Sequence, residues 1–179
     1  MNVDGKETVN FGIVLYDTPS HDISLMEKSL DSLLVATNNY CKSKVGVMMS
    51  FVAGTRKISE TLHLSNFYST EGVWCRGCDQ SKDLDNEKRE TEIFQQLFFA
   101  HFFISMQSGQ TLDPMFFSNV DKIVNAQEKE FVVFENNGIY ALLKSAVRSY
   151  YFNDQCGSYK KTESFLIDES KSRGLYRSL

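Results

Sequence analysis

The sequence predicts an α+β fold: a single domain in which a mixed, mostly antiparallel sheet with a three-strand meander is covered by helices. Apolar runs with strand periodicity alternate with runs at helical spacing, and three strand-like segments follow one another directly. The 179 residues, 42% of them hydrophobic, supply enough apolar side chains for one core. No second composition regime marks another domain.

The first two elements are a buried strand and an amphipathic helix. Residues 10–16 form a short apolar run that ends at the turn-forming sequence Asp17-Thr-Pro-Ser20. From Ile23 to about Cys41, apolar residues recur on one helical face. Asp22 is positioned to cap this helix, because its carboxylate can accept the free N–H groups of the first turn.

Three consecutive strands are expected next. Residues 45–53 are apolar on both faces, which is typical of a central strand, and residues 58–68 alternate between apolar and polar side chains. Residues 72–76 complete the antiparallel meander. The polar segment 54–57 supplies the turn between the first two strands.

The most apolar part of the chain, Ile93 to Met106, is predicted to be a central helix without a polar face, capped by Asp85. A short helix opening at Ser118 and a strand over residues 131–134 follow it. A helix that is apolar nearly all round lies at the centre of a fold or is covered by a partner.

The region after Asn137-Gly138 allows two interpretations. Asn-Gly between apolar runs favours a β-hairpin, whereas the apolar residues from Ile139 to Tyr150 repeat at helical spacing. We favour the helix because the periodic run is long. Residues 1–152 are then the single domain, and residues 153–179 are a polar, partly ordered C-terminal tail.

Charge and local sequence exclude several functional classes. With 23 acidic and 19 basic residues and a net charge of −4, the chain lacks the basic surface of a nucleic-acid-binding protein. Its N-terminus does not resemble a signal peptide, and no apolar stretch approaches the roughly 20 residues of a transmembrane helix. A cytoplasmic or nuclear protein is expected. No phosphate-binding glycine loop is present, so no cofactor is predicted.

One short motif points to thiol chemistry. Residues Trp74-Cys75-Arg76-Gly77-Cys78 resemble the WCxxC redox motif of the thioredoxin superfamily. The resemblance implies that a Cys75 thiolate attacks a disulfide and that Cys78 resolves the mixed disulfide. In that family a helix starts at the motif and a cis proline faces the thiols. Here a helix begins near Asp85, and the downstream Pro114 precedes a predicted helix instead of a strand.

The same cysteines have two other interpretations. Cys75 and Cys78 can supply half of a tetrahedral zinc site, but no second paired spacing completes it. The remaining candidate ligands are Cys41, His63, His101 and Cys156. A purely structural turn at the end of the meander accounts for the same residues and is favoured, with the redox and zinc sites as alternatives.

Aromatic residues give the leading functional hypothesis. Half of the 14 phenylalanines fall on the predicted central helix and the turn after it: Phe94, Phe98, Phe99, Phe102, Phe103, Phe116 and Phe117. Large aromatic side chains dominate the energetics of protein interfaces. We therefore expect a non-enzymatic interaction domain, an adaptor or complex subunit that binds other protein subunits, as a homo- or heterodimer, through this helical surface. The equally supported alternative is that these rings fill the domain's own core.

Overall fold

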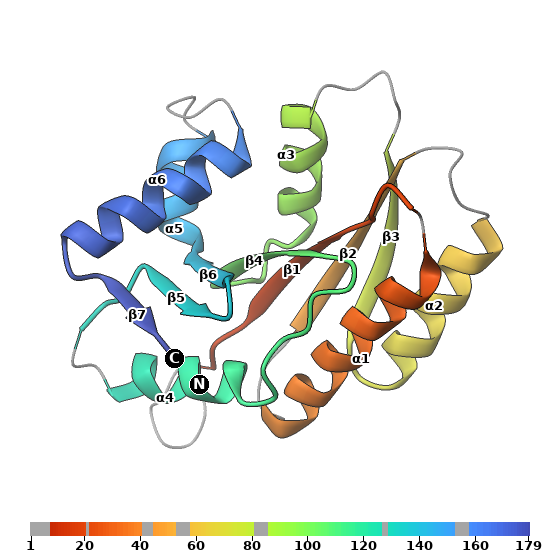
Figure 1. The fold of residues 1–179 in the computed structure, drawn as a ribbon, viewed down its shortest axis with the longest axis horizontal. Coiled ribbons are helices and arrows are strands. Elements are labelled where there is room, and N and C mark those ends of the chain that lie inside the picture. Colours follow the sequence, from red (N-terminus) through yellow and green to blue (C-terminus); the bar gives the residue numbers. More distant parts are fainter. Residues whose placement is uncertain are drawn as a thin grey trace.

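A computed structural model describes residues 8–20, 22–40, 45–52, 58–80, 86–126, 129–152 and 158–179. Within these ranges the chain forms a seven-stranded sheet between two layers of helices (Figure 1). The strands are β1 (Phe11–Tyr16), β2 (Val45–Val52), β3 (Trp74–Gln80), β4 (Phe102–Gln107), β5 (Val133–Asn136), β6 (Ile139–Leu143) and β7 (Tyr176–Ser178). The helices are α1 (Ile23–Tyr40), α2 (Ile58–Thr70), α3 (Asn86–Gln96), α4 (Phe116–Ala126), α5 (Lys144–Val147), the π-helical turn η1 (Arg148–Phe152) and α6 (Tyr159–Ser172).

The sheet is mostly parallel. Its strand order is β3-β2-β1-β4-β6-β5-β7, and β1, β2, β3 and β4 run in one direction. β6 is antiparallel to both β4 and β5, and β7 is parallel to β5. Within the described sheet, β6 therefore opposes the other strands. A helix in each connection, α1, α2 or α3, makes the first four strands parallel, because a parallel pair needs a crossover.

Helices cover both faces of the sheet, so the parallel strands are buried on both sides. α1, α2 and α4 pack on one face, against Phe11, Val47 and Ile104. α3, α5, η1 and α6 pack on the other face, against Val14 and Met48. Strands buried in this way are expected to be continuously apolar, as β1 and β2 are. The described helices include none that combines the length and hydropathy needed to cross a bilayer.

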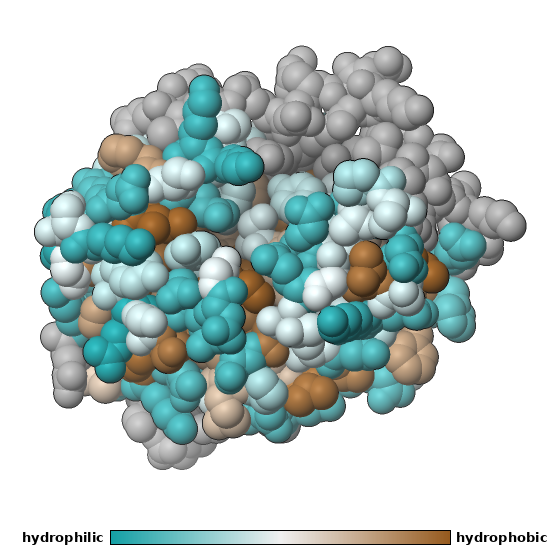
Figure 2. All heavy atoms as spheres, viewed as in Figure 1, coloured by the Kyte–Doolittle hydropathy of each residue, from teal (hydrophilic) through white to brown (hydrophobic). Residues whose placement is uncertain are grey.

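Aromatic rings fill the centre of the α1 face. Phe11 is fully buried, and its ring lies 4.4 Å from that of Phe117 and 6.1 Å from that of Phe102, centroid to centroid. Tyr40 closes the cluster edge-on at 6.0 Å, and its hydroxyl donates to Asp121 Oδ1 at 2.7 Å. On the side of the molecule seen in Figure 2, hydrophobic residues lie in small separate groups among hydrophilic ones.

A close approach between β1 and the chain after α3 requires glycine at position 12. A Cβ at Gly12 would lie 2.9 Å from the Cβ of Ala100 and 3.1 Å from that of Leu97. We expect Gly12→Ala to lower the free energy of unfolding by about 1–3 kcal/mol, since Cβ atoms cannot rotate away. Gly46→Ala is the comparison, because it meets the ring atoms of Phe99 and Trp74, which can swing aside. Urea denaturation should rank Gly12→Ala as the more destabilising, and the reverse order would contradict this packing.

The predicted antiparallel meander is wrong. Residues 58–68, expected as a strand, belong to α2, in which Leu64 and Tyr68 lie one helical turn apart and are both buried. The alternating pattern there is also compatible with a helix, because residues four apart share a helical face. With α2 between β2 and β3, the two strands pair in parallel, Val47 beside Cys75. The predicted turn at residues 54–57 lies outside the described residues.

The predicted central helix from Ile93 to Met106 is also wrong. α3 ends at Gln96, a turn follows, and β4 begins at Phe102. The continuous apolar run arises because the end of a buried helix leads directly into a strand buried on both faces. The predicted cap at Asp85 lies outside the described residues.

The C-terminal third differs from the prediction in two places. After Asn137, which has a positive φ of 51°, the chain forms the β5–β6 hairpin that Asn-Gly indicates, and the favoured helix is wrong. Residues 158–179, expected as a polar tail, form α6 and β7, and β7 pairs with β5. The assignment of residues 1–152 to a single domain stays a prediction.

Candidate functional site

The candidate site lies where the connections of the sheet change sides. From the end of β1 the chain crosses to α1 on one face, whereas α3, which leads into the neighbouring β4, lies on the other. In open α/β sheets such a point leaves a crevice outside the carboxyl ends of the strands, where ligands bind. The residues at the ends of β1, β2 and β4 are therefore the first place to look for a site.

A row of polar side chains crosses these three strand ends. The strand register sets Tyr16 of β1 beside Ser50 of β2 and beside Gln107 of β4. They lie on the α3 face, because alternate residues of each strand, Val14 and Met48 among them, belong to the core on that side. Ser50 is buried, Tyr16 is half-buried and Gln107 is exposed, so the row opens toward solvent at β4.

Hydrogen bonds fix the backbone beneath this row. Asp17 N donates to Ser50 O at 3.1 Å, which joins β1 to β2 one residue beyond Tyr16. Ser108 donates to Tyr16 O twice, from its backbone N at 2.8 Å and from its hydroxyl at 3.0 Å. Gln107 Nε2 also donates to Asp17 O at 3.5 Å. The strand ends are thus held together before any ligand binds.

The turn after β1 presents hydroxyl and carboxylate groups. Asp17 Oδ1 accepts from Thr18 N at 3.0 Å, and the hydroxyls of Thr18 and Ser20 lie 2.8 Å apart. Asp17 and Thr18 are both half-buried. Such groups can bind the hydroxyl and amide groups of a small polar ligand.

The loop after β4 is anchored to α1. Gly109 N donates to Leu25 O at 3.0 Å and to Ser29 Oγ at 2.9 Å, and Ser29 Oγ donates to Gln110 O at 2.7 Å. Gly109 has a φ of +96°, which L side chains rarely adopt. Because α1 fixes this loop, Gln107 and Ser108 are held at the carboxyl end of β4.

The predicted thiol site has neither the backbone nor the reactivity that redox chemistry needs. Cys75 and Cys78 both lie within β3, whereas the redox motif requires a turn that leads into a helix. Burial raises the pKa of the Cys75 thiol to about 12, so it stays protonated at neutral pH. These observations leave the redox alternative unsupported.

Cys75 should therefore resist alkylation in the folded protein. In a variant with serine at Cys41, Cys78 and Cys156, we expect Cys75 to react with iodoacetamide at pH 8 at least a hundredfold more slowly than in 6 M urea. The rate should rise as the pH approaches 12. If Cys75 in the folded protein reacts with iodoacetamide as fast as the thiol of glutathione does, the Cys75 side chain is not buried.

The predicted zinc site has no support either. Among the residues that the structure describes, no three His, Cys, Asp or Glu side chains come together as metal ligands. His63 and His101 are both exposed, and His101 Nδ1 accepts from Asn10 N at 2.9 Å. The other predicted ligands, Cys41 and Cys156, lie outside the described residues.

The seven phenylalanines proposed to bind a partner are divided between the two faces of the sheet. Phe102, Phe116 and Phe117 are buried on the α1 face. Phe94 and Phe103 are buried on the α3 face. Phe99 is half-buried and Phe98 is 73% exposed. The single aromatic helix on which the interaction hypothesis depended does not exist.

No family model matches this sequence, and no curated protein matches it. Solved structures do resemble its fold. A cytidylyltransferase from Leptospira borgpetersenii superposes with a TM-score of 0.55 at 11% identity, over 96% of this chain and 76% of that one. S. aureus TarS 1–349 in complex with UDP superposes with a TM-score of 0.61 at 9% identity, over 96% of this chain and 58% of that one.

A third similar structure contains a sugar nucleotide and a metal ion. The mannosyltransferase PcManGT from Pyrobaculum calidifontis, in complex with GDP-Man and Mn²⁺, superposes with a TM-score of 0.56 at 8% identity. The alignment covers 94% of this chain and 53% of that one, so the chain spans only about half of this structure. At such identities the likeness shows the fold, which resembles the Rossmann-like fold of glycosyltransferases. The prediction of a non-enzymatic adaptor is contradicted, because the structures that share this fold include transferases.

The sequence contained a signal for this site that its interpretation missed. Two buried apolar runs each end in polar residues, Asp17-Thr at the first and Gln107-Ser at the second. Polar residues that follow parallel strands gather at one edge of a sheet. The signal was lost because the second run was taken for a helix.

Proposed function

We propose that this chain binds a nucleoside diphosphate sugar at the carboxyl ends of β1, β2 and β4 and transfers the sugar to an acceptor hydroxyl. The observation that carries the proposal is the strand order β3-β2-β1-β4, with the row of Ser50, Tyr16 and Gln107 across its carboxyl edge. The likeness to a UDP complex and to a GDP-Man complex over nearly the whole chain supports it.

The residues of the row have complementary roles in binding the donor. The half-exposed ring of Tyr16 offers a face on which a nucleobase can stack, and base–aromatic stacking contributes about 1–3 kcal/mol. The Gln107 amide and the Thr18 hydroxyl supply hydrogen bonds for ribose or base. Because Ser108 and Asp17 fix the backbone below, these groups bind without a large ordering cost.

The proposed reaction breaks one bond and forms one. The acceptor oxygen attacks the anomeric carbon of the sugar, and the bond from that carbon to the diphosphate oxygen breaks. The bonding electron pair leaves with the nucleoside diphosphate, and the acceptor's proton passes to a base. The chain's contribution is to hold the donor in the crevice with its anomeric carbon exposed to the acceptor.

Mn²⁺, which the mannosyltransferase complex contains, does not fit the described donor set. Manganese prefers carboxylate and water oxygens. The end of β4 offers instead the Gln107 amide and a Ser108 hydroxyl that donates to Tyr16 O. The Asp17 carboxylate belongs to no described group of three ligands. No step of the reaction is therefore derived through a metal.

Donor binding should accordingly be insensitive to divalent cations. We expect the Kd for UDP or GDP, measured by isothermal titration calorimetry, to change less than threefold between 1 mM EDTA and 1 mM MnCl₂. Affinity that rises tenfold or more with Mn²⁺ would contradict this donor set.

A release assay tests the transfer reaction. The protein is incubated with UDP- and GDP-sugars and a panel of acceptor alcohols, and liberated nucleoside diphosphate is measured. Acceptor-dependent release above that of the Gln107→Ala variant supports the proposal. Binding of nucleoside diphosphate without release under any acceptor would restrict the function to donor binding.

Nucleotidyl transfer is the second candidate. The cytidylyltransferase is supporting evidence because the alignment covers 96% of this chain and 76% of that one. In this reaction a substrate phosphate attacks the α-phosphorus of CTP, and pyrophosphate leaves. Pyrophosphate release from CTP in the presence of sugar phosphates would favour it over glycosyl transfer.

A further inference from the structure

An exposed aromatic ridge lies at the opposite edge of the sheet from the proposed donor site. Trp74 opens β3, Phe98 and Phe99 precede β4, and Lys144 follows β6, which runs antiparallel to β4. All four residues therefore lie at the amino edge of the parallel strands. We call this surface, with the nearby Arg76 and Arg148, the aromatic–basic ridge.

Phe98 is held outward by a rigid turn. Its neighbours Leu97 and Ala100 are buried under α3, and Ala100 N donates to Leu97 O at 3.1 Å. The Lys144 ammonium donates to Phe98 O. With both sides of the turn anchored, the Phe98 ring remains 73% exposed. An exposed ring is informative where other exposed apolar side chains adjoin it, because contiguous apolar surface marks an interaction site.

Two further rings extend Phe98 across the sheet edge. Phe99 meets Phe98 at 6.1 Å and Trp74 at 6.2 Å between ring centroids, each nearly perpendicular. The Phe99 ring lies directly on Gly46 of β2, where a Cβ would overlap it. Glycine at position 46 thus allows the ridge to form, and Trp74 itself stays 42% exposed.

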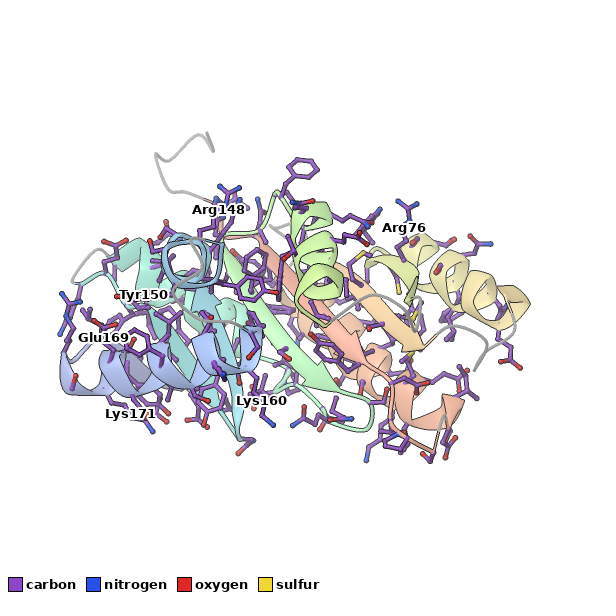
Figure 3. The ribbon with its side chains drawn as sticks, turned by 90° about the horizontal axis from the view of Figure 1, so that it is seen from above. Arg76, Arg148, Tyr150, Lys160, Glu169 and Lys171 are labelled. Carbon is purple, nitrogen blue, oxygen red and sulfur yellow. The ribbon has the colours of Figure 1, made fainter. Side chains whose placement is uncertain are left out.

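Basic side chains flank the aromatic rings. Arg76 is exposed on the same face of β3 as Trp74, two positions away. Lys144 donates to the Phe98 turn, and its pKa is lowered by burial and, to a smaller extent, by the neighbouring charge of Arg148. Figure 3 shows Arg76 and Arg148 along the same side of the molecule, one on each side of α3.

We infer that the aromatic–basic ridge docks the protein on a membrane surface that carries anionic lipids. Trp and other aromatic side chains are favoured at the membrane–water interface, where their rings reach the acyl boundary. Lys and Arg beside them are attracted to anionic headgroups. Phe98 and Trp74 would enter the interface while Arg76, Lys144 and Arg148 contact phosphate and carboxylate groups. This inference does not depend on the proposed function, because it uses the opposite edge of the sheet.

Other occupants fit the ridge less well. A two-fold dimer places a patch against itself, and the cations Arg76, Lys144 and Arg148 would then face like charges. An anionic lipid surface matches both the apolar rings and the sign of the charges.

The single tryptophan provides a direct probe, because it lies in the ridge. The full chain is mixed with vesicles of phosphatidylcholine alone or with 30% phosphatidylserine, and Trp74 emission and co-sedimentation are measured. We expect a blue shift and sedimentation with the anionic vesicles and at least tenfold weaker partitioning in 0.5 M NaCl. An unchanged spectrum and no sedimentation at low salt would overturn the inference.

Variants locate the contact. Phe98→Ser and Arg148→Glu should each reduce vesicle partitioning about tenfold or more without changing the Tm, because both side chains are exposed. Phe67→Ser, which removes a 50% exposed ring from α2, is the matched control and should bind as the unmodified chain does. An equal loss in the control would overturn the inference. So would dimerisation in sedimentation velocity that Phe98→Ser abolishes, because the ridge would then bind a second copy.

Discussion

Phe11→Ala is expected to lower the free energy of unfolding by about 3–5 kcal/mol, the usual cost of removing a fully buried phenylalanine. The ring contacts Tyr40, Phe102 and Phe117, which belong to three different elements. Its loss leaves a cavity that a strand hydrogen-bonded on both sides cannot close by moving. For a chain of this size the Tm should fall by about 10 °C.

Urea denaturation followed by circular dichroism measures this effect. Phe67→Ala is the matched control, because that ring is 50% exposed, and it should cost less than about 1 kcal/mol. If both variants lose the same stability, the α1 face of β1 is not the centre of the core as described.

Tyr16→Ala is expected to weaken nucleoside diphosphate binding at least tenfold. Tyr16 is half-buried and lies between Ser50 and Gln107 at the carboxyl ends of the strands. Removing it takes away the stacking face, which is worth about 1–3 kcal/mol, but not the backbone bonds that hold the strand ends.

Tyr16→Phe separates stacking from hydrogen bonding. It keeps the ring, so its Kd should stay within threefold of the unmodified protein's. A Phe variant as weak as the Ala variant would assign the effect to the hydroxyl. If Tyr16→Ala and Tyr16→Phe both bind with the affinity of the unmodified protein, Tyr16 does not belong to the site.

Strong local signals correctly predicted the N-terminal elements. The apolar run ending at Asp17-Thr-Pro-Ser20 is β1, and the periodic run from Ile23 is α1, whose Asp22 cap accepts from Ser24 N at 2.9 Å. Each has one dominant periodicity and a clear terminator. Each of these two elements can be assigned from its own residues, without information from the rest of the chain.

The assignment of the later elements depended on tertiary context, which the sequence alone does not show. The run from Ile93 to Met106 joins a helix end to a doubly buried strand, and an apolar segment without periodicity cannot show where one ends and the other begins. The α2 segment has a weak pattern that fits both states. These two assignments decide whether the sheet is parallel or antiparallel, so the topology and the site at β4 were lost together.

The aromatic count had a similar limit. Composition shows that the chain holds many rings but not which face of the sheet receives them. Phe103 and Phe102 are adjacent in β4 and lie in opposite core layers. Once β4 is assigned as a strand, the rings that had been expected on one helical surface divide between two core layers, and Phe98 remains exposed.

Calorimetric titration of the full chain with UDP, GDP and CTP tests the central claim most directly. A site at the carboxyl edge predicts a single-site isotherm in the micromolar range with at least one of the three nucleotides, and at least tenfold weaker binding in Tyr16→Ala. The absence of binding heat and of a Tm shift with all three at millimolar concentration would contradict it. If Tyr16→Ala and Gln107→Ala both bind nucleotide with the affinity of the unmodified chain, the site does not lie at this edge.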